Sequence, residues 1–204
     1  MVARPTLNAP ALAPEAALAF DPSLDVLLDR LEQHEATSPA QAEIAATMIA
    51  FAREHPDALV RTCLDGHFTG SALVVEEGTD RFVVLHHTKL DKWLQPGGHT
   101  DGDANLAATA RREASEETGI AGLRVVWPAI DLDIHEVRPP AESPHLHLDV
   151  RHVVLAPAGS TLVGNHESRD LRWVTIADLD ALGADDGLRR LAVNGLALAA
   201  RLDR

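Results

Sequence analysis

The sequence predicts an α+β protein in which helices cover a mixed β-sheet. Three observations support this prediction: short runs of β-branched residues, apolar residues at helical spacing near both ends, and an irregular alternation of the two patterns. Irregular alternation that includes a hairpin is typical of a mixed sheet, not of a regular βαβ repeat. With 204 residues, of which 46% are hydrophobic, the chain can build a packed core.

Residues 1–22 form a segment that we expect to be a flexible leader, since they are rich in Ala and Pro. Arg4 is the one cationic side chain in this stretch, which therefore matches a secretory signal poorly. No run approaches the roughly 18 apolar residues of a membrane span. The single Cys63 excludes an internal disulfide. Without an export signal or disulfides, we expect a cytoplasmic protein that does not enter a membrane.

Residues 23–64 predict an N-terminal segment of two helices. Asp21 is the expected N-cap of the first helix, with Pro22 at the first helical position. Ser38 is the expected N-cap of the second, followed by Pro39. This segment either caps the main domain or forms a dimer contact. Because dimers are the commonest soluble assembly, we favour a homodimer.

Residues 65–204 form the predicted main domain. A hairpin is expected where two β-rich runs, 71–75 and 82–85, flank a turn at 77–80. The other expected elements are strands at 93–94, 123–127, 129–136, 146–155 and 171–175, and helices at 104–118, 176–182 and 188–202.

The net charge of −13 argues against a dedicated nucleic-acid binder or a protein of anionic membrane surfaces, because polyanions are bound by a positive field. An enzyme that acts on phosphates with a metal ion can still be acidic, since the metal supplies positive charge locally. The composition therefore leaves small anionic substrates open.

Three carboxylates, Glu113, Glu116 and Glu117, stand at positions i, i+3 and i+4 of the predicted helix and so share one face. Like charges so placed destabilise a helix by a few tenths of a kcal/mol per pair, about the magnitude of other i,i+4 effects. A cation between them reverses that sign, and oxygen ligands suit Mg²⁺ or Mn²⁺. The alternative is a solvated acidic helix face, which is the commoner fate of glutamates.

A glycine-containing loop, Gln95–His99, leads into this helix and favours the metal-site interpretation. Glycines allow the backbone to approach a ligand closely. Asp101 or Asp103 is the expected N-cap, and Gly119 closes the helix in the C′ position.

The stretch Gly98–Ile120 resembles the Nudix box, and every spacing of that motif holds. The matching residues are Gly98, Arg112, Glu113, Glu116, Glu117, Gly119 and Ile120. Two positions depart from the pattern: Ala104 replaces the first Glu, and Ala114 is smaller than the usual aliphatic residue. The resemblance extends over about residues 66–182.

Membership of this family would imply an α/β/α sandwich with a mixed β-sheet, here with an N-terminal helical extension. The implied activity is that of a pyrophosphohydrolase acting on acid anhydrides. With Mg²⁺ or Mn²⁺, it would cleave a diphosphate linkage in a small nucleoside diphosphate derivative: a nucleoside triphosphate, nucleotide sugar, ADP-ribose or similar compound. The alternative is a non-catalytic, Nudix-like regulatory module that binds a nucleotide. The intact carboxylates favour catalysis.

By the same resemblance, Glu116 and Glu117 would bind the metal directly, together with the carbonyl of Gly98. Glu113 would complete the metal site or deprotonate the attacking water. Arg112 would pair with a carboxylate of the box and hold its rotamer. The missing Glu at Ala104 leaves open whether a nearby aspartate compensates for it.

Some Nudix enzymes take their general base from a loop outside the box. Glu167, just before the last predicted strand, is the candidate here, and a solvated loop acid is an equal alternative. His99 follows Gly98 directly and is a candidate substrate contact. Trp93 is a candidate for stacking on a base, and the other aromatic candidates are Trp127, Trp173 and Phe68.

His145, His147 and Asp149 alternate along a predicted strand and therefore share one face. A zinc site is one interpretation, but catalytic zinc requires three converging protein ligands, and the chain has no recognised zinc-enzyme spacing. Solvated or hydrogen-bonded histidines are the favoured interpretation.

Overall fold

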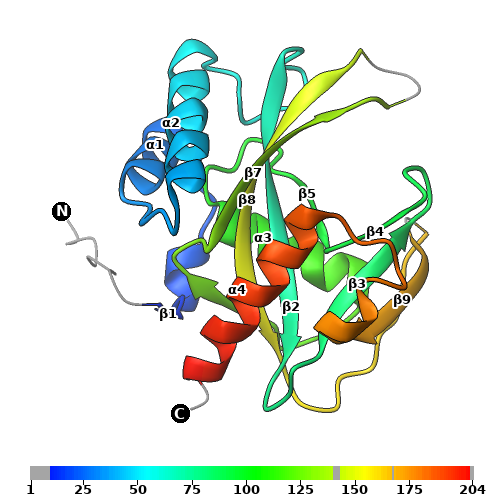
Figure 1. Ribbon diagram of the computed structural model, residues 1–204. Helices are drawn as coiled ribbons and strands as arrows, with labels where there is room; N and C mark the ends of the chain where they lie inside the picture. Colours follow the sequence, from blue (N-terminus) through cyan, green and yellow to red (C-terminus); the bar gives the residue numbers. More distant parts are fainter. Residues whose placement is uncertain (1–9, 140–142, 167, 203–204) are drawn as a thin grey trace.

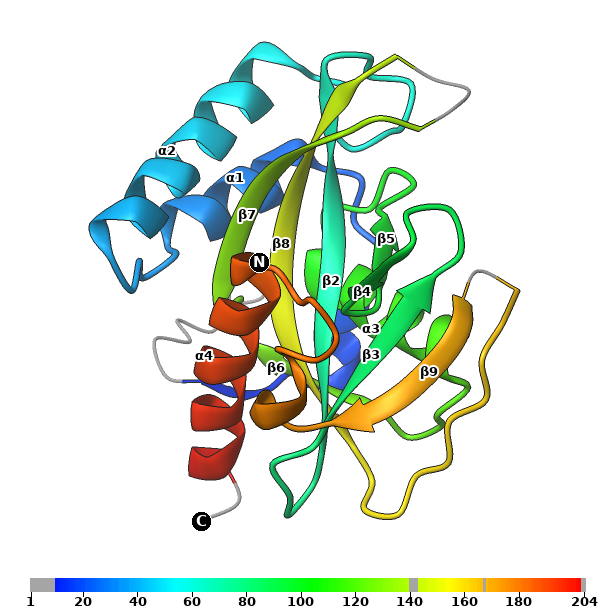
Figure 2. The ribbon, with the colours of Figure 1, turned by 45° about the vertical axis from the view of Figure 1, so that its right-hand side comes forward.

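The computed structural model describes residues 10–139, 143–166 and 168–202. A mixed β-sheet lies between helices on its two faces (Figure 1). Helix α4 (Asp186–Leu202) lies in front of the sheet and α3 (Leu106–Thr118) behind it, and the rotated view agrees (Figure 2). The expected α/β/α sandwich of the α+β class is confirmed.

The centre of the sheet is a long parallel pair, β2 (Gly66–Glu76) and β8 (His145–Ala156). Their register runs unbroken from Gly66 opposite Leu146 to Glu76 opposite Ala156. Antiparallel neighbours of this pair are β5 (Gly97–His99) on β2, and β6 (Arg124–Trp127) and β7 (Asp131–Val137) on β8. The register of β2 with β3 consists of Val75 opposite Phe82, after the predicted hairpin turn. The remaining strands are β3 (Phe82–His87), β4 (Lys92–Leu94) and β9 (Ser168–Val174), the last two paired with β3.

Alternating residues of β2 face opposite helices. Ala72 and Val74 join the apolar cluster beneath α3, whereas Leu73 and Val75 join the cluster beneath α4. A β-carbon at Gly70 would lie 2.9 Å from the carbonyl oxygen of Leu106 and from the side chain of Thr109. The missing side chain at Gly70 therefore lets α3 pack directly on the backbone of β2.

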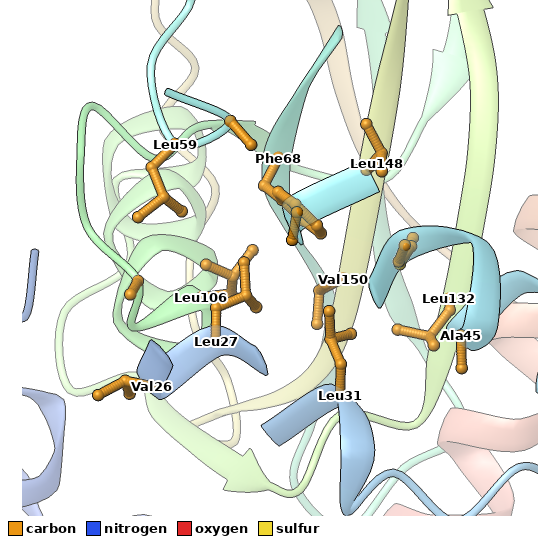
Figure 3. Packing of buried hydrophobic residues seen from close by; sticks show 14 residues of the cluster. Val26, Leu27, Leu31, Ala45, Leu59, Phe68, Leu106, Leu132, Leu148 and Val150 are labelled. Atoms are coloured by element: carbon orange, nitrogen blue, oxygen red, sulfur yellow. The ribbon is translucent and has the colours of Figure 1, made fainter. Parts of the chain in front are cut away.

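The two N-terminal helices share a core with the main domain (Figure 3). Leu27 and Leu31 of α1 (Leu24–Glu32) are buried in one cluster with residues of α3, β7 and β8. Helix α2 (Pro39–Glu54) adds the fully buried Met48. Of the two roles considered for this segment, its packing supports that of a cap on the main domain.

The N-terminal boundaries differ in part from the predictions. Ser38 caps α2 as expected, because its hydroxyl accepts a hydrogen bond from the backbone N–H of Gln41 (3.2 Å). Asp21 is not the N-cap of α1, which is Ser23. The carboxylate of Asp21 instead accepts from the Ser23 N–H (2.9 Å), so the helix begins two residues later than predicted, at Leu24.

The described part of the expected leader, residues 10–22, is packed on the domain. Strand β1 (Ala11–Leu12) pairs with β6, and the 3₁₀ turn η1 (Glu15–Leu18) buries Leu18. The sequence did not reveal this because a two-residue strand has no periodicity. A second 3₁₀ turn, η2 (Ile176–Asp178), lies within the helix expected at 176–182. Within the described ranges, no helix is long and apolar enough to cross a membrane.

The close packing of α3 on Gly70 predicts that a larger residue at this position would destabilise the fold. Gly70→Ala would force α3 away from β2 and should lower the free energy of unfolding by about 1–3 kcal/mol, the usual cost of overpacking. Urea denaturation measures this change. Thr47→Ala, at an exposed position of α2, is the control and should stay within about 0.5 kcal/mol of the parent. A parent-like stability for Gly70→Ala would show that α3 does not depend on this contact.

Candidate active site

The glycines of β5 bring the carboxylates of α3 against the sheet. The backbone N–H of Gly97 donates a hydrogen bond to Oε2 of Glu117 (2.9 Å), whose side chain is 3% exposed. A β-carbon at Gly98 would lie 2.6 Å from the carboxyl carbon of Glu113. Glycine at 98 is therefore required for the Glu113 carboxylate to lie directly on the backbone.

Arg112 connects this loop to the carboxylates. Its Nη1 lies 2.7 Å from Oε1 of Glu113 and 3.6 Å from Oε2 of Glu116. Its Nη2 donates to the carbonyl oxygen of His99 (2.7 Å). The predicted pairing of Arg112 with a carboxylate of the motif is thus present, and the same side chain fixes β5 relative to α3.

The donor set fits a divalent cation. Three carboxylates and one guanidinium leave two negative charges when all are ionised, which one Mg²⁺ or Mn²⁺ would balance. The Glu113 side chain is 12% exposed and that of Glu116 is 57% exposed, so solvent reaches the cluster from the Glu116 side. Oxygen ligands are those that these hard cations prefer.

Ala104 is fully buried beneath the N-terminal segment, which accounts for a small residue at this position. Its backbone N–H donates to the carbonyl of Asp21 (2.7 Å). Asp103 accepts hydrogen bonds from the N–H groups of Asp21 and Asn105, and Asp101 pairs with Arg61. Both aspartates therefore have structural partners in the loop.

The predicted caps of α3 need correction at one end. The N-cap is Asn105, not Asp101 or Asp103, and its side chain makes no capping hydrogen bond. Its amide nitrogen instead donates to the carbonyls of Ala17 and Ala19, which ties the start of α3 to the N-terminal segment. At the other end, Gly119 adopts the expected left-handed conformation, with φ of 67°.

His99 lies in a group of histidines that the sequence does not place together. His67 of β2 is opposite His147 of β8, while His99 of β5 is opposite Thr69. Directly paired residues point to the same face of a sheet, so all three imidazoles lie on the face away from α3. The ring centroid of His67 lies 4.9 Å from that of His99 and 4.9 Å from that of His147.

The imidazoles of His67 and His147 are uncharged at neutral pH. Burial, and then the neighbouring imidazoles, lower the pKa of His67 to about 4 and the pKa of His147 to about 2. His67 is 1% exposed, and neither of its ring nitrogens makes a hydrogen bond of normal geometry, although the nearby backbone of Cys63 acts to raise its pKa against these effects.

A buried ionic network continues along the same face and was missed in the sequence. Asp149 accepts hydrogen bonds from the hydroxyls of Thr69 and Ser71, and it pairs with Arg151 at 2.7 Å. Arg151 also pairs with Asp131, which receives Arg190 from α4. Asp149 and Arg151 are two residues apart on β8, but their other partners lie far apart in sequence, so only the tertiary structure could have revealed those contacts. Alternation did predict that Asp149 shares a face with the histidines.

The aromatic candidates separate by burial and contacts. Phe68 is fully buried in the core and cannot stack on a substrate base. Trp127 lies beneath the guanidinium of Arg30, and Trp173 donates its indole N–H to the carbonyl of Ser160. Trp93 is partly buried and stacks on His86, with ring centroids 5.0 Å apart. Glu167, the candidate general base, lies outside the described residues.

Comparison with known proteins adds sequence and fold similarity. The family model for the NUDIX domain matches residues 67–192. Phosphatase NudJ of Escherichia coli K12 is 35% identical over 82 residues, which cover 39% of this chain and 50% of that protein. The chain thus spans about half the length of the curated relatives it matches.

Solved structures share the fold. A NUDIX-family hydrolase from Clostridium perfringens has a TM-score of 0.51 and 23% identity, and the match covers 67% of this chain and 97% of the other. The Ap4A hydrolase of C. elegans has a TM-score of 0.53 and 16% identity, with coverage of 66% and 98%. The E. coli dihydroneopterin triphosphate pyrophosphohydrolase has a TM-score of 0.52 and 16% identity, with coverage of 64% and 94%.

The lowered pKa values of His67 and His147 predict that the free energy of unfolding decreases as the pH is lowered below neutrality. Below pH 6.5 the unfolded chain takes up protons at these rings, whereas the folded protein binds none at His67 until about pH 4. The free energy of unfolding should therefore fall between pH 7 and pH 5 by about 1–2 kcal/mol for each ring. Denaturation in EDTA at several pH values measures it. His67→Gln should reduce this slope, and exposed His166→Gln should keep it; equal slopes would contradict the prediction.

Proposed function

Because the chain belongs to the Nudix family, we propose that it is a pyrophosphohydrolase that uses Mg²⁺ or Mn²⁺ to cleave a diphosphate linkage in a nucleoside diphosphate derivative. The observation that carries the proposal is the packing of Glu113 and Glu117 on the Gly97–Gly98 backbone, with Glu116 on the same helix face in contact with Arg112. A solvated acidic helix face would not bury Glu117 or pack a carboxylate against glycine.

The proposed ligands are the carboxylates of Glu113, Glu116 and Glu117 and the carbonyl of Gly98. A divalent cation held there supplies charge neutralisation at the phosphoryl oxygens and lowers the pKa of bound water. Glu117 is held by the Gly97 N–H, so its carboxylate is already oriented before substrate arrives. Such fixed electrostatic positioning contributes to catalysis without reorganisation during the reaction.

Arg112 has a positioning role in this proposal. Its guanidinium contacts Glu113 and the His99 carbonyl together, so it keeps the carboxylate and the glycine loop in one geometry. Glu113 stays a candidate for either a metal ligand or the group that takes the proton from attacking water.

The proposed substrate contacts are His99, which follows Gly98, and Trp93 on neighbouring β4. Two of the structurally similar proteins are an Ap4A hydrolase and a dihydroneopterin triphosphate pyrophosphohydrolase, whose named substrates both contain phosphoanhydride bonds. They support the class of linkage, whereas the organic groups differ. A cytoplasmic location and a homodimer stay predictions from the sequence.

The test of this function is turnover of a substrate panel with Mg²⁺ or Mn²⁺, measured as coupled phosphate release. The panel contains nucleoside triphosphates, nucleotide sugars, ADP-ribose and dinucleoside polyphosphates. Turnover of one class supports the enzyme. Tight binding without turnover would instead support the alternative, a regulatory module that binds a nucleotide.

Glu117→Gln should lower kcat by about 100-fold or more, because it removes a charged ligand from a preorganised site. Turnover is measured with the best substrate of the panel across a range of Mg²⁺ concentrations. The matched control is Glu54→Gln, at an exposed position of α2, which should keep the parent kcat. A parent-like kcat for Glu117→Gln would exclude this carboxylate from catalysis.

Glu167→Gln tests the proposed general base outside the Nudix box. Loss of such a base should lower kcat by about 10²–10⁴-fold while substrate binding changes little. The kcat and KM are measured at saturating metal. Unchanged turnover would remove Glu167 from the mechanism and leave Glu113 as the candidate base.

A further inference from the structure

Three imidazoles from three strands converge at one end of the sheet. His67 of β2, His99 of β5 and His147 of β8 each offer a ring nitrogen, and these atoms all lie within 4.8 Å of one another. The strand pairing fixes this arrangement, since His67 is directly opposite His147 and His99 is opposite Thr69, two residues along β2. The group therefore stands on paired backbone and not on loops.

The ring nitrogens of His67 are buried without forming hydrogen bonds. Its ring is 1% exposed, and both Nδ1 and Nε2 are buried without a hydrogen-bond partner. A buried polar group left unsatisfied is destabilising, and buried polar groups are otherwise almost always paired. Coordination of a cation by one nitrogen would give this ring a partner.

Two further imidazoles beside His147 are already oriented by other groups. Nδ1 of His135 lies 2.9 Å from a carboxylate oxygen of Asp133, and Nδ1 of His145 lies 2.8 Å from the carbonyl oxygen of Ser143. These contacts distinguish them from His67. Their ring centroids lie 5.6 Å and 5.4 Å from that of His147, so both pack beside the three converging rings.

We propose that His67, His99 and His147 form a three-imidazole site for a divalent transition metal ion such as Zn²⁺, separate from the carboxylate site on α3. Imidazole nitrogen suits zinc, copper, nickel and iron, whereas Mg²⁺ prefers oxygen ligands. Three protein ligands leave a fourth tetrahedral position open. His99 and His147 are partly exposed, so water or an anionic oxygen of a small ligand would take that position.

The geometry requires only a small closure. Zinc–nitrogen bonds of about 2.0–2.1 Å place tetrahedral ligand nitrogens about 3.3 Å apart. The ring nitrogens already lie within 4.8 Å of one another, so coordination would draw them together by about 1.5 Å at most. The site would also be linked to α3, because the His99 carbonyl accepts a hydrogen bond from Arg112.

Zinc binding to the full chain, stripped of metal with EDTA, tests the proposal. Equilibrium dialysis with metal analysis is performed in saturating Mg²⁺, and again in a Glu113→Gln/Glu117→Gln double variant, so that zinc at the carboxylates is suppressed. We expect one Zn²⁺ per chain in both. His67→Gln, His99→Gln and His147→Gln should each weaken binding by more than about 100-fold, beyond the 10–100-fold cost of losing a second-shell contact.

The matched control is His166→Gln, which changes an exposed histidine and should keep the parent affinity. Because His67→Gln can disturb folding, ring ¹⁵N NMR of the unaltered protein gives an independent measurement. Zinc should shift the ring nitrogens of His67, His99 and His147 as coordinated nitrogens. The proposal fails if the parent binds no zinc, or if zinc persists in the histidine variants and is lost with the glutamates. Both readouts are independent of diphosphate turnover, so the proposed hydrolase activity can fail separately.

Discussion

The parallel pairing of β2 with β8 is the constraint on which the rest of the molecule depends. Strand β2 is buried along its whole length, and its two faces meet different helices. The same strand carries Gly70, against which α3 packs, and pairs with the glycines of β5. A one-residue shift in this register would exchange the two faces and separate the carboxylates from the loop they contact.

The carboxylate cluster on α3 gathers three like-charged side chains beside one guanidinium. Arg112 contacts Glu113 and Glu116, and the Gly97 N–H holds Glu117. These contacts hold three carboxylates together on one helix face. In the proposed function, a bound cation would relieve the repulsion between these carboxylates.

Local patterns predicted much of the fold, because helices, caps and the hairpin are encoded within a few neighbouring residues. The Ser38 cap, the Gly119 terminus and the register of the glutamates on α3 follow from such spacing. Strand β5 and the position of His67 do not, since they exist only through pairing between distant segments. The burial of Ala104 likewise depends on the N-terminal segment that lies over it. The geometry of the candidate site was therefore predictable where its residues share one helix.

The region that matches the family model is smaller than the region that packs as one structural domain. The family match begins at residue 67, yet Asn105 at the start of α3 binds carbonyls of residues 17 and 19, and Leu106 shares a core with α1. A protein trimmed to the matched region would expose this apolar surface and release the start of the helix that bears the carboxylates. The extension is thus structurally part of the domain, and its removal would leave the buried face of Leu106 and the start of α3 open to water.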